Sequence, residues 1–158
     1  GLAGVLRKAG RGDEAEAQYR ETLRLDPSHS RARTDLAAML ASAGRLEDTI
    51  ALYREGVQVS PTDTDSRYTL ALALLSRESQ QTRRSDIDEA IQHLERVVVD
   101  RPTFAEAHYN LGVAVFMSGR PADAVAPIRE SIRLNPNDPQ PHEFLAFIEK
   151  QVSAPEAP

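Results

Sequence analysis

The 158-residue chain contains no cysteine and no tryptophan. The absence of cysteine excludes a disulfide framework, a thiolate zinc site and a cysteine nucleophile, and it leaves the redox compartment open. No run of 18 apolar residues occurs, so no segment is expected to span a membrane. Positive charge is scarce as well, because 19 Lys and Arg residues are outnumbered by 24 Asp and Glu residues. A net charge of −5 gives no electrostatic basis for following a phosphate backbone, so we do not expect nucleic acid as a partner.

Motifs for catalysis and for cofactor binding are also missing from the sequence. No glycine-rich phosphate-binding motif occurs, and Ser76 has no His and Asp in a triad arrangement. The acidic residues within 86–89 could do acid–base chemistry, but helix capping explains them better. His108 and His142 occupy equivalent positions, yet no third metal ligand is in register with them. We therefore expect no enzyme activity, no cofactor and no metal site.

What the sequence does contain is an internal repeat. One proline recurs at intervals of 34, 41 and 34 residues, at Pro27, Pro61, Pro102 and Pro136. A second column of small residues keeps the same intervals, at Ala15, Thr49, Ala90 and Ala124. Because the columns agree, the repeat has a period of 34 residues with one insertion of seven, which we place at about 77–85.

Each repeat is predicted to form two helices. In 31–42 and again in 47–59 the apolar residues recur three or four positions apart, as on one face of a helix. Gly44 separates the two segments, and Pro61 ends the second one. After the insertion, Ser85 and Asp88 resemble a capping box and predict a helix start at Ser85.

Together these columns resemble the tetratricopeptide repeat family over residues 1 to about 151. The best unit is 105–138, which contains His-Tyr-Asn-Leu-Gly at 108–112 and Gly-Arg-Pro-Ala-Asp-Ala at 119–124. The chain departs from the family at the first bulky position, often Trp, which is occupied by Arg33, Arg67, His108 and His142. The resemblance implies an all-α fold, namely a right-handed α-solenoid of TPR helix-turn-helix repeats. It also implies a scaffold for protein–protein interaction, in which the first helix of each repeat lines a concave surface.

The repeat columns also predict the organisation of the chain. We expect an incomplete first repeat at 1–28, with the native chain extending upstream, and full repeats at 29–62, 63–103 and 104–138. The third of these repeats carries the insertion. A helix at 139–152 is expected to cap the stack with a polar outer face, and a disordered tail follows at 153–158. The compartment is not fixed by these patterns, although the cytoplasm is slightly favoured.

The third and fourth repeats are apolar on the face opposite to their packing face, which predicts an apolar groove. Exposed apolar surface usually marks an interaction site. The expected partner-binding residues are Tyr68, Leu72, Leu75, Tyr109, Asn110, Val113, Phe116, Met117 and Phe147. The same residues could instead pack within the chain. The Lys and Asn cluster with which family members capture a C-terminal carboxylate is absent, so we do not expect that mode of binding.

The predicted function is therefore non-catalytic binding of a partner peptide or protein in the apolar concave groove. Two alternatives stay open. The chain could associate with itself to form a homo-oligomer, or it could be the substrate-docking arm of a larger enzyme that extends upstream.

Overall fold

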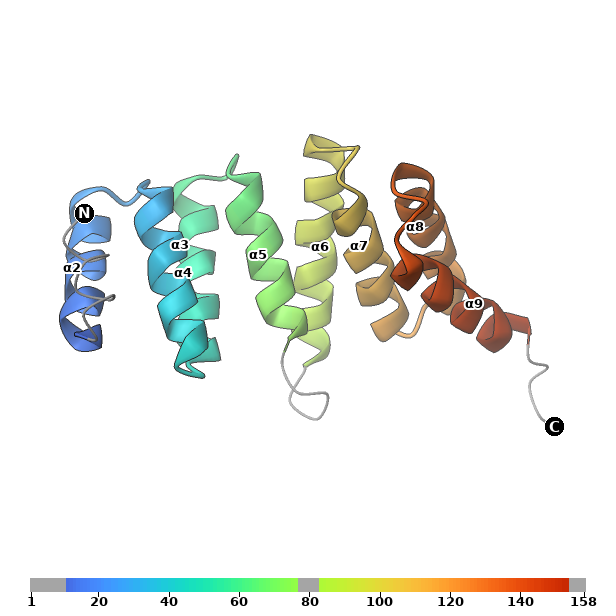
Figure 1. Cartoon of the computed structure of the whole chain (residues 1–158), viewed down its shortest axis with the longest axis horizontal. Helices are drawn as coiled ribbons and strands as arrows, with labels where there is room; N and C mark the ends of the chain where they lie inside the picture. Colours follow the sequence, from blue (N-terminus) through green and yellow to red (C-terminus); the bar gives the residue numbers. More distant parts are fainter. Residues whose placement is uncertain (1–10, 77–82, 154–158) are drawn as a thin grey trace. The chain divides into compact units, whose positions relative to one another are not determined.

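The computed structural model of the chain describes residues 11–76 and 83–153, and every regular element in these two ranges is an α-helix (Figure 1). The chain divides into two compact units, Gly1–Ala73 and Leu74–Pro158, here called the N-terminal unit and the C-terminal unit. The predicted all-α fold of paired helices is confirmed in both.

The N-terminal unit is built from α2 (Gly12–Leu25), α3 (Ser30–Ser42), α4 (Leu46–Val59) and α5 (Thr64–Leu75), whose last two residues belong to the other unit. Helix α3 packs against both α2 and α4. The buried side chains follow the predicted helical spacing, and they include Ala15, Tyr19, Leu23, Leu36, Leu40, Ile50 and Tyr53. Burial of this apolar surface is the main force that holds the helices together.

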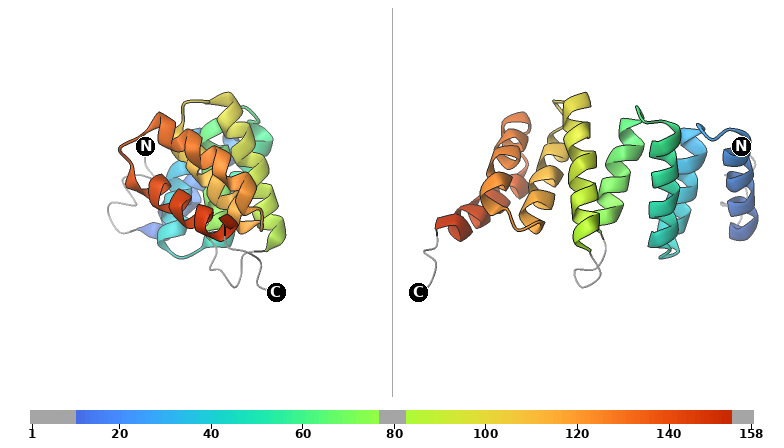
Figure 2. Two further views of the ribbon diagram at one scale, coloured as in Figure 1. Left: turned by 90° about the vertical axis from the view of Figure 1, so that its right-hand side faces the viewer. Right: turned by 180° about the vertical axis from the view of Figure 1, so that it is seen from behind.

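The C-terminal unit contains α6 (Arg84–Asp100), α7 (Ala105–Met117), α8 (Pro121–Leu134) and α9 (Pro139–Ser153). Helix α7 packs against α6 and α8, and α9 packs against α8 (Figures 1 and 2). Its core includes Leu94, Val97, Ala107, Ala114, Ile128 and Ile148. These buried residues fix α7 and α9 on α8, and so they set the positions of the side chains on the free faces of both helices.

Two turns between paired helices depend on glycine. Gly44 and Gly119 have φ of 70° and 85°, a left-handed conformation in which a Cβ atom would be strained. In both turns the glycine N–H binds the carbonyl three residues earlier, and the N–H of the following arginine binds the carbonyl five residues earlier. This pattern is a Schellman motif, which satisfies the last carbonyls of α3 and α7. It explains why glycine recurs between the helices of a repeat.

The residues at the family's bulky position each make the same kind of hydrogen bond. Arg33 donates from Nη2 to the carbonyl of Pro27 at 2.5 Å, and Arg67 donates in the same way to Pro61. His108 and His142 donate from Nε2 to the carbonyls of Pro102 and Pro136, at 3.0 and 3.1 Å. Each side chain thus ties the first helix of its repeat to the turn six residues upstream. The bond uses the Nε2 proton of each histidine, which removes that nitrogen as a metal ligand.

The start of α6 differs from the predicted one. The helix begins at Arg84, and the carboxylate of Asp86 accepts the backbone N–H of Arg83 at 3.2 Å. Ser85 therefore lies inside the first turn, and the predicted capping box of Ser85 and Asp88 is wrong. A buried Asp86, 4% exposed, reaches back to the unpaired N–H and takes the capping role. Of the predicted insertion, 77–82 lies outside the described residues, as do 1–10 of the first repeat and 154–158 of the tail.

Candidate partner-binding site

The nine predicted partner-binding residues lie on three helices, and none of them is buried. Helix α5 carries Tyr68, Leu72 and Leu75, α7 carries Tyr109, Asn110, Val113, Phe116 and Met117, and α9 carries Phe147. Phe147 is 46% exposed and Met117 is 38% exposed, while the others are half-buried. Tyr68 and Leu72 belong to the N-terminal unit, and the remaining seven belong to the C-terminal unit.

Four rings of the C-terminal unit form an aromatic cluster: Tyr109 and Phe116 on α7, and Phe144 and Phe147 on α9. The ring of Phe144 meets the rings of Tyr109 and Phe116 edge to face, with centroids 6.0 and 5.4 Å apart. Phe147 meets Phe116 at 5.5 Å and stacks on Phe144 at 6.2 Å. These separations are those at which aromatic pairs attract beyond simple burial. The cluster therefore holds its own rings in place before anything binds.

An open hollow of about 350 Å³ lies beside the aromatic cluster. Three of its lining residues are aromatic, and two are polar: Tyr109, Phe144, Phe147, Gln140 and Glu143. On α9 the lining positions are three, four and seven residues after Gln140, which places them on one face of the helix. The hollow is thus the seam where that face of α9 meets α7.

Hydrogen bonds and an ion pair fix α9 in this position. At its start, the carboxylate of Asp138 accepts the backbone N–H of Gln140 at 3.0 Å. Farther along, Arg129 of α8 donates to Glu149 of α9 at 2.9 Å. Asp138 thus caps the start of α9, and the Arg129–Glu149 pair attaches a later part of α9 to α8.

The electrostatic environment of the hollow is negative. Burial of the Tyr109 hydroxyl raises its pKa, and the charges of Asp138 and Glu143 raise the pKa further. Glu143 is exposed and has no ion-pair partner in the described part of the chain. None of the residues that line the hollow is basic. An aromatic wall therefore adjoins a carboxylate whose charge is not balanced locally.

The sequence profile of the tetratricopeptide repeat family matches residues 1–64 and 82–139, which is most of the chain. The chain belongs to the tetratricopeptide repeat family. The unmatched stretch between the two regions includes the start of the predicted insertion. Proteins of this family bind other proteins and are typically scaffolds without catalytic activity.

Solved structures share the fold at low sequence identity. The crystal structure of MamA has a TM-score of 0.81 at 20% identity, and the match covers 96% of this chain and 85% of MamA. Residues 41 to the end of MamA from Desulfovibrio magneticus RS-1 match with a TM-score of 0.79 at 19% identity, over 96% of this chain and 81% of that one. PilF from Pseudomonas aeruginosa matches with a TM-score of 0.72 at 21% identity, over 96% of this chain and 66% of PilF. No curated protein matches this tetratricopeptide repeat chain in sequence.

Three residues that line the hollow were not predicted: Gln140, Glu143 and, central to the cluster, Phe144. It lies between the other rings of the cluster and lines the hollow. The repeat itself contained the signal, since Phe144 follows Asn110 by one period of 34 residues. That column is polar in the earlier repeats, at Asp35, Thr69 and Asn110, so an aromatic residue was not expected at this position. Asn110 itself donates its side-chain amide to the carbonyl of Glu106 at 2.8 Å.

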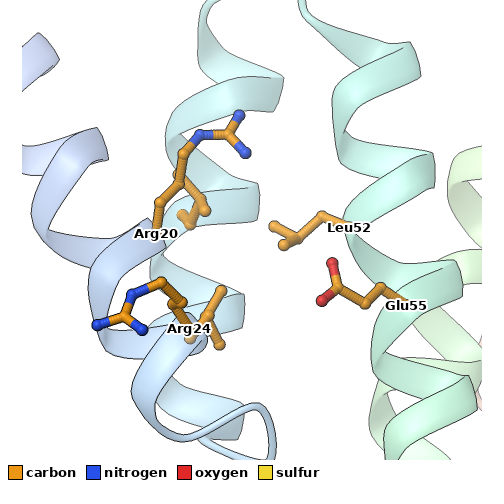
Figure 3. Close-up of a pocket in the computed structure, with 6 residues that line it drawn as sticks. Arg20, Arg24, Leu52 and Glu55 are labelled. Atoms are coloured by element: carbon orange, nitrogen blue, oxygen red, sulfur yellow. The ribbon is translucent and has the colours of Figure 1, made fainter.

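A second hollow, of about 230 Å³, lies in the N-terminal unit between α2 and α4 (Figure 3). Arg20 and Arg24 border it on α2, and Leu52 and Glu55 border it on α4. Both arginines already form ion pairs, Arg20 with Glu16 at 2.9 Å and Arg24 with Glu21 at 2.7 Å. The sequence analysis did not single out this hollow.

Two further properties of the described ranges bear on function. Within residues 11–76 and 83–153, no three His, Asp or Glu side chains are grouped so that they could hold a metal ion. None of the helices in these ranges combines the length and the hydrophobicity that crossing a bilayer requires.

Proposed function

We propose that the chain is a non-catalytic scaffold that binds a segment of a partner protein, with the aromatic cluster of the C-terminal unit as the contact. The observation that carries this proposal is the exposure of Phe147 in a preformed aromatic hollow. Aromatic residues and methionine are enriched where interfaces concentrate their binding energy.

Part of the aromatic cluster lies outside the buried core of the unit. Ile128 of α8 and Ile148 of α9 are fully buried, whereas Phe116 and Phe144 are half-buried and Phe147 is exposed. A ring that only packed within the chain would be expected to be covered, whereas Phe147 is 46% exposed. This supports a binding role for the cluster over intramolecular packing.

The size of the hollow favours a short segment over a second copy of the chain. With a volume of about 350 Å³, the hollow is a small local feature of the surface. A stable protein–protein interface buries about 800 Å² on each partner, far more than the rim of such a hollow provides. We therefore assign the site to a linear segment of another protein, and treat self-association as an outcome of the test.

The expected binding energy is modest. At 46% exposure Phe147 leaves about 100 Å² of its surface in water. Full coverage of that area would contribute roughly 2.5 kcal/mol before the costs of association are subtracted. Because the rings are already held by one another, little ordering cost falls on this side of the interface.

The lining residues also support a role without catalysis. The hollow presents one carboxylate, one amide and one phenol, and these groups do not include a nucleophile with an adjacent general base. This set of side chains suits recognition by hydrogen bonding and ring contacts.

The test is selection of ligands from a random peptide library on the 158-residue chain, followed by fluorescence anisotropy of the selected peptides. Phe147→Ala should weaken their binding about fivefold or more. Val99→Ala is the matched control, because Val99 is 68% exposed on α6, away from the cluster, and it should leave binding unchanged.

Equal binding to wild type and Phe147→Ala would overturn the assignment of the site. Sedimentation velocity covers the main alternative. A dimer that dissociates in Phe147→Ala would replace peptide binding with self-association through the same rings.

A further inference from the structure

We infer that the partner segment places a basic side chain, arginine or lysine, in the hollow formed by Tyr109, Phe144, Phe147 and Glu143. This inference rests on the proposed function, and it names the chemistry of the residue that the site recognises.

The aromatic part of the hollow suits a cation. Three of the five lining residues are aromatic, and Phe144 and Phe147 are stacked with their planes 18° apart. A cation near the face of an aromatic ring is attracted by the negative charge density of that face. The aliphatic stem of lysine or arginine also covers apolar ring surface while the charged end stays at the rim.

The polar part of the hollow points to the same occupant. Glu143 lines it, is exposed and has no ion-pair partner in the described part of the chain. Asp138, at the start of α9, adds a second negative charge on the same side, and both charges act on the Tyr109 hydroxyl. A carboxylate beside a ring is a site for a charge-assisted hydrogen bond from guanidinium or ammonium.

Among the described residues of the C-terminal unit, the cations form no ion pair with Glu143. Arg129 is engaged with Glu149 at 2.9 Å, and Lys150 is exposed on α9 but does not line the hollow. A neutral side chain that covered the rim would remove Glu143 from water without a partner, which is costly. A basic side chain covers the rings and pairs with the carboxylate at once.

The hollow of the N-terminal unit provides an internal contrast. There two arginines line the hollow beside Glu55, and each of them also pairs with a glutamate, Arg20 with Glu16 and Arg24 with Glu21. It also lacks aromatic lining residues. The preference for a basic side chain is therefore specific to the C-terminal hollow.

The experiment compares three synthetic peptides that differ at one position: acetyl-Ala-Leu-Xaa-Leu-Ala-amide, with arginine, citrulline or norleucine as Xaa. Citrulline has the shape of arginine without its charge, and norleucine supplies only the aliphatic stem. Binding is followed by ¹⁵N chemical-shift titration of the 158-residue chain. The arginine peptide should shift the signals of α7 and α9 saturably and bind about threefold more tightly than the citrulline peptide at low salt. Raising the salt should reduce this preference.

Glu143→Gln should bring the affinities for the arginine and citrulline peptides within about 1.5-fold of each other. Glu95→Gln makes the same charge change at an exposed site on α6, and should preserve the preference.

Three outcomes would overturn the inference. If the norleucine peptide shifts α7 and α9 as strongly as the arginine peptide, the hollow binds apolar side chains, and the proposed function survives without its charge preference. If Glu143→Gln keeps the full preference, Glu143 is not the recognising group. If none of the peptides shifts α7 or α9, the hollow is not a side-chain site, and library selection then decides the proposed function separately.

Discussion

Gly112 is the position where the packing of the C-terminal unit can be tested most sharply. A Cβ atom there would lie 2.4 Å from Cδ1 and 2.5 Å from Cγ1 of Ile128, and 3.2 Å from the carbonyl oxygen of Ala124. Ile128 is fully buried, so its side chain has no open space to move into. Gly112 thus sets the distance between α7 and α8.

Two opposing contributions set the change in the free energy of unfolding for Gly112→Ala. Overpacking of a core typically costs about 1–3 kcal/mol. Alanine in place of glycine inside a helix stabilises the folded state by about 1 kcal/mol. The neighbouring carbonyl of Ala124 is backbone and cannot rotate away, so we expect an overpacking cost of about 2–3 kcal/mol. After the gain from alanine is subtracted, the net loss of stability is about 1–2 kcal/mol.

The assay is urea unfolding followed by far-UV circular dichroism. Gly12→Ala is the control, because a Cβ at Gly12 meets nothing within 4 Å, and it should change stability by less than about 0.5 kcal/mol. The double variant with Ile128→Val removes Cδ1, one of the two Ile128 atoms that clash, and keeps a γ carbon. Ile128→Val alone should cost about 1 kcal/mol, and in the Gly112→Ala background its cost should be smaller. A Gly112→Ala chain as stable as wild type, or additive effects of the two changes, would refute this account of the helix contact.

Three further predictions concern stability. Gly119→Ala should cost about 1 kcal/mol in urea unfolding because φ is 85° there, and Gly119→Asn should recover part of the loss; equal stabilities would contradict this reading of the turn. Pro127 lies inside α8, so Pro127→Ala should raise the free energy of unfolding, by up to about 3 kcal/mol, and a lower value would show that the ring is needed for packing. The hydrogen bond from Arg45 lowers the pKa of Glu16, so this contact stabilises the fold above the ordinary pKa of 4.5 and is lost as the pH falls through the lower, folded-state value. Glu16→Gln should therefore make the stability profile flatter below pH 4.5, and an unchanged slope would refute the contribution.

Much of the fold was predictable because the repeat makes many positions depend on one another. The period placed Gly44 and Gly119 in equivalent turns, and both have positive φ. The start of α6 was not predictable in the same way, because it follows the insertion, where no repeat column applies. Asp86 reaches back from the third position of the helix to the free N–H of Arg83, and this contact depends on where the helix begins.

The candidate site was predictable in part, and for a different reason. Helical spacing placed Tyr109 and Phe116 on one face of α7, where the structure has them in the same cluster. Spacing gives no exposed fraction, so it could not show that Phe147 stays open to solvent. Phe144 was missed because its column is polar in the other repeats. The negative charge of the hollow comes from Glu143 acting beside Tyr109, a combination across two helices that no single column contains.

The account depends most on the claim that the aromatic cluster of the C-terminal unit is where a partner segment binds. The direct measurement is a ¹⁵N chemical-shift map of the 158-residue chain with a peptide selected from a random library. Saturable shifts centred on Tyr109, Phe144 and Phe147 are the predicted result. Shifts confined to α2, α3 and α4, with those three residues unmoved, would contradict it and place binding in the N-terminal unit.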